Sequence, residues 1–169
     1  SLDLSNCLRV GDVSPLQGLD SLRVLRLFGC SGLTNLKPLY QLSDLEKLSL
    51  PNNIDDGDFL GLCIGFSGLT QLDLRNCSTV TDLSPLERLK GVEDLSLAGC
   101  DAITDLEPLT QLTELTRLDL AYCTKITDLS PLYELEKLED VYLDGCRKIS
   151  RDQIRDLSEQ LPECCIHRG

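Results

Sequence analysis

The chain has 169 residues and a net charge of −12 at pH 7, it contains no tryptophan, and only 4 % of its residues are aromatic. Nucleic acids and anionic membrane surfaces attract clustered lysine and arginine side chains, so this composition disfavours both as partners. The longest apolar run, around residues 60–66, is too short to span a bilayer. A neutral or basic protein is therefore the expected partner.

Six cysteines recur in register along the chain: Cys7, Cys30, Cys77, Cys100, Cys123 and Cys146. Successive cysteines are 23 residues apart except for one interval of 47, which accommodates a further unit with Asn53 at the equivalent position. A fixed period of this length indicates a solenoid of stacked units. We therefore divide residues 1–149 into seven units, the first of which begins in mid-pattern, and assign residues 150–169 to a terminal cap.

The first half of each unit predicts a β-strand. In "LTRLDLAYC" (residues 115–123), Leu118 and Leu120 alternate with Asp119 and Ala121, so the leucines share one face of the strand. Strands of successive units are expected to pair in parallel at a spacing of about 4.8 Å. One unit cannot bury its leucines alone, but stacking buries them in a continuous core.

This pattern resembles the leucine-rich repeat, whose units read L-x-x-L-x-L-x-x-N/C. The segment "TDLSPL", at residues 81–86 and 127–132, is similar to the short-arc repeats of phosphatase-regulator and internalin-like proteins and to repeat blocks of protozoan parasite proteins. The resemblance implies an α/β solenoid of horseshoe shape. Its parallel sheet forms the concave side, short 3₁₀ and loop segments form the convex side, and a C-terminal helix caps the end.

The second half of most units predicts a short helical turn. Ser14, Ser84 and Ser130 are the expected N-caps, and the proline that follows each of them suits the first helical position. So few residues allow a 3₁₀ turn but no long helix.

The third unit, residues 52–69, lacks the proline turn and is one residue longer than the others. Asp58 is expected to cap a helical turn over residues 59–64, and Cys63 is expected to fill core space rather than react. We expect this unit to change the local curvature and to offer a contact surface on the outer face.

Residues 150–161 predict a true helix, because Ser150 and Gln153 can form a capping box and the apolar residues recur on one face. Pro162 ends the helix, and residues 164–167 are expected to add a last edge strand. Such a segment closes the exposed end of a solenoid core. Because the chain starts in mid-pattern and has no methionine, we expect it to be a fragment of a longer protein.

The recurring cysteine takes the position where leucine-rich repeats carry Asn or Cys, and it is expected to hydrogen-bond backbone groups of the neighbouring turn. A row of thiols does not converge tetrahedrally, and a zinc ligand would not be replaced by Asn53, so no metal or other cofactor is expected. Disulfides stay open as an alternative, since neighbouring units place Cα atoms within bonding range. Persisting buried thiols favour a reducing compartment, which predicts an intracellular protein.

A second column of the repeat is acidic, with an Asn equivalent in one unit: Asp12, Asn35, Asp82, Asp105 and Asp128. Stacked carboxylates can bind Ca²⁺, but the Asn and the position just before the proline segment favour an Asx turn. The chain has one histidine, His167, and neither a nucleophile–base spacing nor a phosphate-binding loop. We therefore expect no catalysis and no small-molecule substrate.

The outward strand positions vary between units, and they are the candidate binding residues of the concave face. Phe28 is notable because it puts an aromatic ring where solvent is expected, and with Val24 and Arg26 it forms a mixed apolar–basic patch. Aromatic and arginine side chains dominate interface hot spots. The predicted protein-binding set is Val24, Arg26, Phe28, Lys47, Gln71, Asp73, Arg75, Arg117, Asp119, Tyr122 and Tyr142.

Three functions are compatible with this pattern. The first is a non-catalytic scaffold that binds a protein through the concave face. The second is the substrate-recognition or regulatory part of a larger enzyme, such as a ubiquitin ligase or a phosphatase complex, with catalysis elsewhere. The third is an extracellular adhesion or surface-recognition module, which the reduced cysteines oppose.

Overall fold

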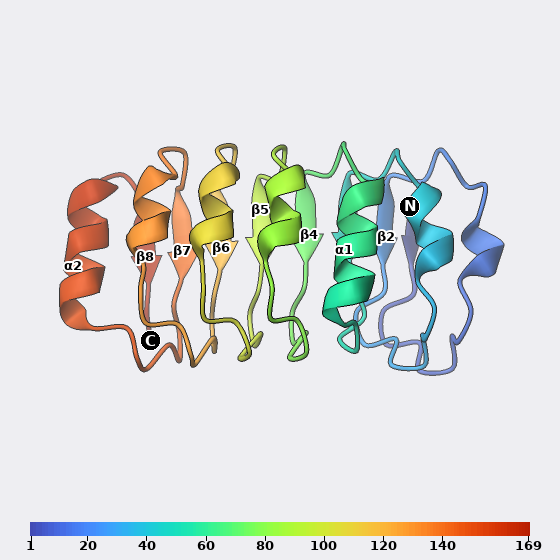
Figure 1. Cartoon of the computed structure of the whole chain (residues 1–169), viewed down its shortest axis with the longest axis horizontal. Coiled ribbons are helices and arrows are strands. Elements are labelled where there is room, and N and C mark those ends of the chain that lie inside the picture. Colours follow the sequence, from blue (N-terminus) through green and yellow to red (C-terminus); the bar gives the residue numbers. More distant parts are fainter.

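The sheet of this chain contains eight parallel strands in chain order, as the computed structural model of residues 1–169 shows (Figure 1). The strands are β1 (Leu2–Asp3), β2 (Val24–Arg26), β3 (Lys47–Ser49), β4 (Gln71–Asp73), β5 (Asp94–Ser96), β6 (Arg117–Asp119), β7 (Asp140–Tyr142) and β8 (Cys165–His167). Each strand hydrogen-bonds only the strands before and after it in sequence, so the sheet is an open stack, one strand per unit. The predicted parallel sheet is confirmed.

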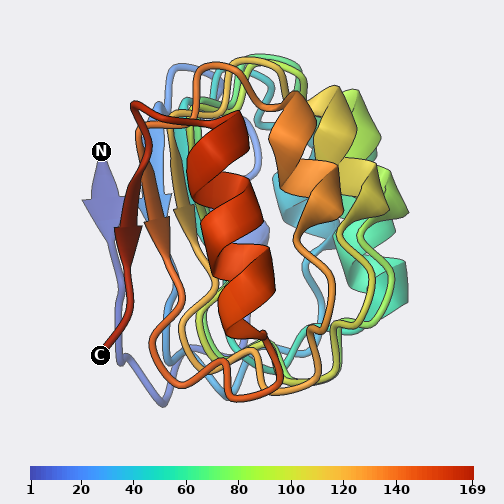
Figure 2. The same ribbon diagram turned by 90° about the vertical axis from the view of Figure 1, so that its left-hand side faces the viewer.

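The core is a continuous stack of leucines behind this sheet. The central residues of the strands pair from unit to unit, and they are Leu2, Leu25, Leu48, Leu72, Leu95, Leu118, Val141 and Ile166. All buried apolar side chains belong to one cluster that extends from Val13 to Leu161. In the end view the first and last strands stand further out than the middle ones, so the exposed face of the sheet is concave (Figure 2).

The opposite, convex side carries short 3₁₀ helices. They are η1 (Ser14–Leu16), η2 (Lys37–Gln41), η3 (Ser84–Arg88), η4 (Glu107–Gln111) and η5 (Ser130–Glu134). The serines are not their N-caps, contrary to prediction. Each serine is the first helical residue, a buried Val or Leu precedes it without a side-chain cap, and proline takes the second position.

The third unit forms a longer helix than predicted, α1 (Asp56–Gly65), in front of the sheet (Figure 1). Asp55, not Asp58, is its N-cap: the Asp55 backbone is extended, and its carboxylate accepts the N–H of Asp58 at 2.8 Å. The prediction was wrong because the helix begins earlier than the apolar pattern suggests. Cys63 is buried as predicted, whereas the side chain of Ile64 is exposed on the outer surface.

The C-terminal helix α2 (Arg151–Gln160) and strand β8 have the predicted places. Ser150 accepts the N–H of Gln153 at 3.2 Å, which is half of the expected capping box. The other half would be a bond from the Ser150 backbone N–H to the Gln153 side chain. The Gln153 side-chain amide instead donates to Asp128 of the preceding unit at 3.4 Å. β8 pairs in parallel with β7 and extends the sheet. None of the helices has the length and apolar character that crossing a membrane requires.

Candidate binding face

The strand register aligns the outward residues in columns that cross the concave face. The first column is Val24, Lys47, Gln71, Asp94, Arg117, Asp140 and Cys165. The second column is Asp3, Arg26, Ser49, Asp73, Ser96, Asp119, Tyr142 and His167. The structure therefore brings most of the predicted set together on one surface. It also adds Cys165 and His167 of β8, which the sequence analysis left out of this face.

A shallow hollow of about 280 Å³ lies over strands β2 to β5, with Arg26, Phe28, Arg75 and Asp94 among its lining residues. Phe28 is not a freely exposed ring. It is half-buried, and the guanidinium of Arg75 lies 5.5 Å from its ring centroid. The basic partner of the Phe28 ring is therefore Arg75, two units further along, and not Arg26 of the predicted patch, which lies 3.9 Å from Asp3.

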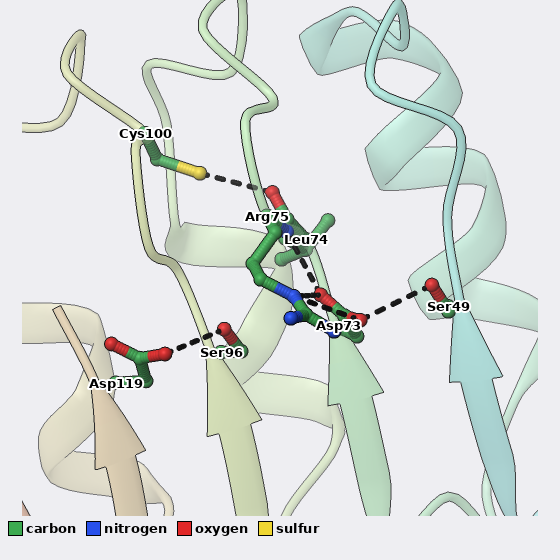
Figure 3. Close-up of polar contacts among 7 residues, drawn as sticks. All are labelled: Ser49, Asp73, Leu74, Arg75, Ser96, Cys100 and Asp119. Atoms are coloured by element: carbon green, nitrogen blue, oxygen red, sulfur yellow. Dashed lines mark hydrogen bonds and ion pairs between the residues drawn. The ribbon is translucent and has the colours of Figure 1, made fainter. Parts of the chain in front are cut away.

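Arg75 is fixed from two sides. Its Nη2 and Nε atoms donate to the two carboxylate oxygens of Asp73 at 2.7 and 3.1 Å, and Phe28 lies under the guanidinium. Asp73 in turn accepts the hydroxyl of Ser49 at 3.2 Å (Figure 3). The same arrangement recurs two units later, where Ser96 donates to Asp119 at 3.3 Å (Figure 3). Asp73 and Asp119 are therefore each held in place by a hydrogen bond from a serine of the preceding unit.

Asp94 lies at the centre of the first column and has no hydrogen-bonded cation. Burial raises the pKa of its carboxyl group, and the charges of Asp73 and Asp119 raise it further, whereas Arg117 and Lys47 lower it. A carboxylate in this position is incompletely compensated, because burial disfavours its charged form. A cationic group of a partner could therefore pair with the partly desolvated carboxylate of Asp94.

This raised pKa predicts how stability changes with pH. Protonated Asp94 favours the folded chain, so its contribution is present below the unfolded carboxyl pKa and is lost as the pH rises through the folded pKa. We expect Asp94→Asn to increase the free energy of unfolding at pH 7 and to leave it unchanged near pH 3. Urea unfolding at both pH values measures this, with the exposed Asp101→Asn as the control. An equal effect of Asp94→Asn at the two pH values would contradict the assignment.

At the far end of the face, aromatic and basic groups form a chain of contacts. Arg117 donates from Nη2 to the Tyr142 hydroxyl at 2.9 Å, and its guanidinium lies 5.1 Å from the ring centroid. The rings of Tyr142 and His167 stack with centroids 4.3 Å apart. Nε2 of His167 lies 2.6 Å from Oδ1 of Asp140. Strict alternation in "CCIH" is the signal that could have placed His167 on this face.

Tyr122 lies outside the strands, in the turn after β6, which corrects its predicted place on the sheet. It has a left-handed backbone with φ of 62°, and its side chain is 64 % exposed. Its ring covers Gly145 of the next unit, where a Cβ would lie 2.6 Å from Cδ1 of Tyr122. Asn6 and Asn76 are the other non-glycine residues with this conformation, so Tyr122 is an exposed aromatic at a position that suits Asn or Gly.

Comparison with known proteins identifies the family. A model described as Leucine Rich repeats (2 copies) matches residues 90–134. The crystal structure of internalin C2 from Listeria monocytogenes superposes with a TM-score of 0.73 and 30 % sequence identity, covering 94 % of this chain. This chain is a leucine-rich-repeat protein.

Two other solved structures share the leucine-rich-repeat fold with this chain. The internalin inlF of Listeria monocytogenes has a TM-score of 0.56, 21 % identity and 94 % coverage of this chain. A chain in the crystal structure of the yeast Rad7 and Elc1 complex has a TM-score of 0.63, 20 % identity and 84 % coverage. The chain spans 66 %, 59 % and 40 % of the length of internalin C2, inlF and the yeast chain. Among curated protein sequences, none matches it.

The buried thiols of this leucine-rich-repeat chain hydrogen-bond the preceding unit. Sγ of Cys100, Cys123 and Cys146 donates to the carbonyls of Leu74, Leu97 and Leu120 at 3.1, 3.1 and 3.0 Å; Figure 3 shows the first of these bonds. In the third unit the Asn53 amide donates to the Leu33 carbonyl at 2.7 Å. All nine cysteines are unpaired. The thiols and the amide are thus equivalent donors in sequence but bond different carbonyls, because each cysteine bonds the residue 26 positions before it and Asn53 bonds the residue 20 positions before it.

Thiol reactivity should separate these positions. Burial raises the pKa of Cys100 to about 12 and also raises that of Cys123, whereas Cys7 and Cys165 are exposed. A disulfide reagent at pH 8 is expected to label Cys7 and Cys165 rapidly, and the buried thiols only after unfolding. Mass spectrometry of the labelled peptides measures this, with nine thiols expected in denaturant without reductant. Fewer than nine would show that disulfides form.

The acidic column forms turns. The carboxylates of Asp12, Asp82, Asp105 and Asp128 and the amide oxygen of Asn35 each accept the backbone N–H two residues later, at 2.8 to 3.2 Å. These are the predicted Asx turns, and each one satisfies the N–H of the first residue of the 3₁₀ helix that follows. No group of three or more His, Cys, Asp or Glu side chains is placed to hold a metal ion.

Proposed function

We propose that this leucine-rich-repeat chain is a non-catalytic scaffold that binds a protein partner through its concave face. The observation that supports this most is the register of the sheet. It holds one inward column of Leu, Val and Ile in every unit, whereas the neighbouring outward columns contain cations, carboxylates, amides, hydroxyls and aromatic rings. A rigid core with a varied outer surface is the arrangement that repeat proteins use for extended binding surfaces.

Two groups on this face are suited to anchor a partner. Arg75 is oriented by Asp73 and Phe28, and Arg117 is oriented by Tyr142. Side chains that are already ordered lose little conformational freedom on binding, so their contacts contribute more to affinity. Arginine and tyrosine are also the residue types most enriched in interface hot spots.

The charge pattern indicates what the partner presents. Asp94, between Arg75 and Arg117 along the sheet, is desolvated and has no hydrogen-bonded cation. A lysine or arginine of the partner would offset this charge at little further desolvation cost, because Asp94 is already half-buried. We infer a partner with a basic side chain at the centre of its binding segment and acceptor groups on either side, opposite the two arginines.

We also propose a reducing, intracellular compartment, and the hydrogen bonds of the buried thiols support this. Cys100, Cys123 and Cys146 each satisfy a backbone carbonyl of the neighbouring unit, and oxidation would remove that donor. A reducing compartment would preserve these donors.

A charge-reversal experiment tests the proposal. Wild type, Arg75→Glu/Arg117→Glu and Arg88→Glu/Lys90→Glu are each used to capture proteins from extracts of the source cells, and each captured protein is quantified. Arg88 and Lys90 are exposed, lie away from the concave face and form no ion pair, and their reversal changes the net charge equally. The partner is expected to be lost by roughly ten-fold or more with the concave variant only.

Thermal unfolding of both variants checks that they are folded, and Arg75→Gln/Arg117→Gln repeats the test without introducing repulsion beside Asp73. Equal recovery with the concave variant and wild type would exclude the concave face. Equal loss of the partner with both charge-reversal variants would show that binding depends on the net charge of the chain and not on the concave face.

A further inference from the structure

A cluster of four basic residues lies at the C-terminal end of the solenoid, away from the concave columns. This basic corner comprises Arg147, Lys148, Arg151 and Arg168. The first two occupy the turn before Ser150, the third begins α2, and the fourth follows β8. The start of α2 and the end of the chain lie at the same edge of the molecule (Figure 1). All four side chains belong to exposed residues.

None of these four cations has a carboxylate partner within 4 Å, although the chain has 28 acidic residues. The acids of α2 are engaged elsewhere, because Arg155 pairs with Asp152, Asp156 and Glu159 at 3.0, 3.2 and 3.8 Å. A chain with a net charge of −12 therefore keeps one corner where four cations form no ion pair. One carboxylate borders this corner, because Asp144 accepts the backbone N–H of Gly169 at 2.5 Å.

The corner is hollowed. Arg151, Ile154, Arg168 and Gly169 line a cleft of about 430 Å³. Arg168 is held at its wall by a bond from Nη2 to the Ile149 carbonyl at 3.1 Å. Ile154 is half-buried and packs on the edge of the core. The cleft thus offers two guanidinium groups beside one aliphatic side chain.

We propose that the basic corner is a second docking surface, which binds an acidic segment of a partner protein. Guanidinium groups bind carboxylates through paired N–H donors, and Ile154 can receive an aliphatic side chain next to the acidic residue. Charge complementarity selects this occupant. Nucleic acids and anionic membranes extend far beyond the corner, and their phosphates would face the negative charge of the rest of the chain. A short acidic segment meets the corner alone.

The experiment uses a fluorescent peptide of alternating glutamate and leucine, with a glutamine–leucine peptide as the neutral probe. Binding is measured by anisotropy for wild type, for Arg151→Glu/Arg168→Glu and for Arg9→Glu/Lys90→Glu. The last pair is exposed, unpaired and distant from the corner, and it changes the net charge equally. The acidic peptide is expected to bind wild type at least ten-fold more tightly than the corner variant, and the control pair within about two-fold of wild type.

Further arms identify the site and the ligand. In ¹⁵N–¹H NMR spectra the acidic peptide should shift the amides of residues 150–154 and 168–169, and Arg75→Glu/Arg117→Glu should not weaken it. Shifts confined to β2–β7, equal loss in both reversal variants, or no binding by wild type would each overturn the proposal. The proposal would also be overturned if single-stranded DNA or phosphatidylserine vesicles bound more tightly than the acidic peptide and lost binding in the Arg151→Glu/Arg168→Glu variant.

Discussion

Leu118→Ala is expected to lower the free energy of unfolding by about 3 kcal/mol, because truncation of a fully buried leucine loses transfer free energy and leaves a cavity. Leu118 is 0 % exposed and pairs laterally with Leu95 and Val141. The cavity therefore lies between two units and weakens both stacking interfaces. Urea unfolding followed by circular dichroism measures the change.

Leu60→Ala is the matched control for this substitution. Leu60 lies on α1 and is 44 % exposed, so we expect a loss below about 1 kcal/mol, since nearly half of its surface already contacts water and its truncation leaves no enclosed cavity. A similar loss at the two positions would contradict a core that depends on stacking.

Gly65→Ala is expected to destabilise the chain by about 2 kcal/mol, although alanine is the better helix former. Gly65 is the last residue of α1, and a Cβ there would overlap the backbone carbonyl oxygen of Tyr40 in η2. A backbone atom cannot move aside as a flexible side chain can. The helix would have to shift away from η2, and Phe59, which is fully buried, would lose contacts.

Gly68→Ala provides the comparison for Gly65→Ala. A Cβ on Gly68 would meet its nearest neighbours at 3.9 Å, an ordinary contact. We expect it to be neutral or slightly stabilising, since alanine reduces the entropy of the unfolded chain. If both substitutions are neutral in thermal and urea unfolding, the close approach of α1 to η2 is not what fixes the third unit.

Most of the fold could be predicted because one periodicity determines it. The 23-residue interval fixes which residues become neighbours, and the alternation in each strand fixes which face they occupy. The pairing of Arg26 with Ser49 follows from these two regularities alone. The pairing of Ser49 with Asp73 follows once the extra residue of the third unit is counted.

The N-caps could not be predicted as well. Asp55 and Asp58 are both suitable residues in front of the same apolar segment. The structure uses Asp55 because the helix starts at Asp56, whose carboxylate accepts N–H groups of Thr81 and Asp82 in the next unit at 2.8 and 3.2 Å. That contact joins residues of neighbouring units, so no local pattern reports it.

The contacts within the binding face were the least predictable part. Arg75 has several rotamers, and only the folded surface selects the one that reaches Asp73 and covers Phe28. His167 was missed for another reason. It pairs with Tyr142 across an interval of 25 residues, because the cap is out of phase with the repeat. The register of the last strand therefore cannot be extrapolated from the other units.

Site-specific photo-crosslinking tests the concave-face assignment most directly. A benzophenone amino acid replaces Phe28 or Tyr142 on the concave face, or Tyr133 of η5 on the convex side, so that each change exchanges one aromatic ring for another. After irradiation in source-cell extract, Phe28 and Tyr142 are predicted to give the same covalent protein adduct, and Tyr133 none. An adduct from Tyr133 without one from Phe28 or Tyr142 would contradict the assignment and place the interface on the convex side.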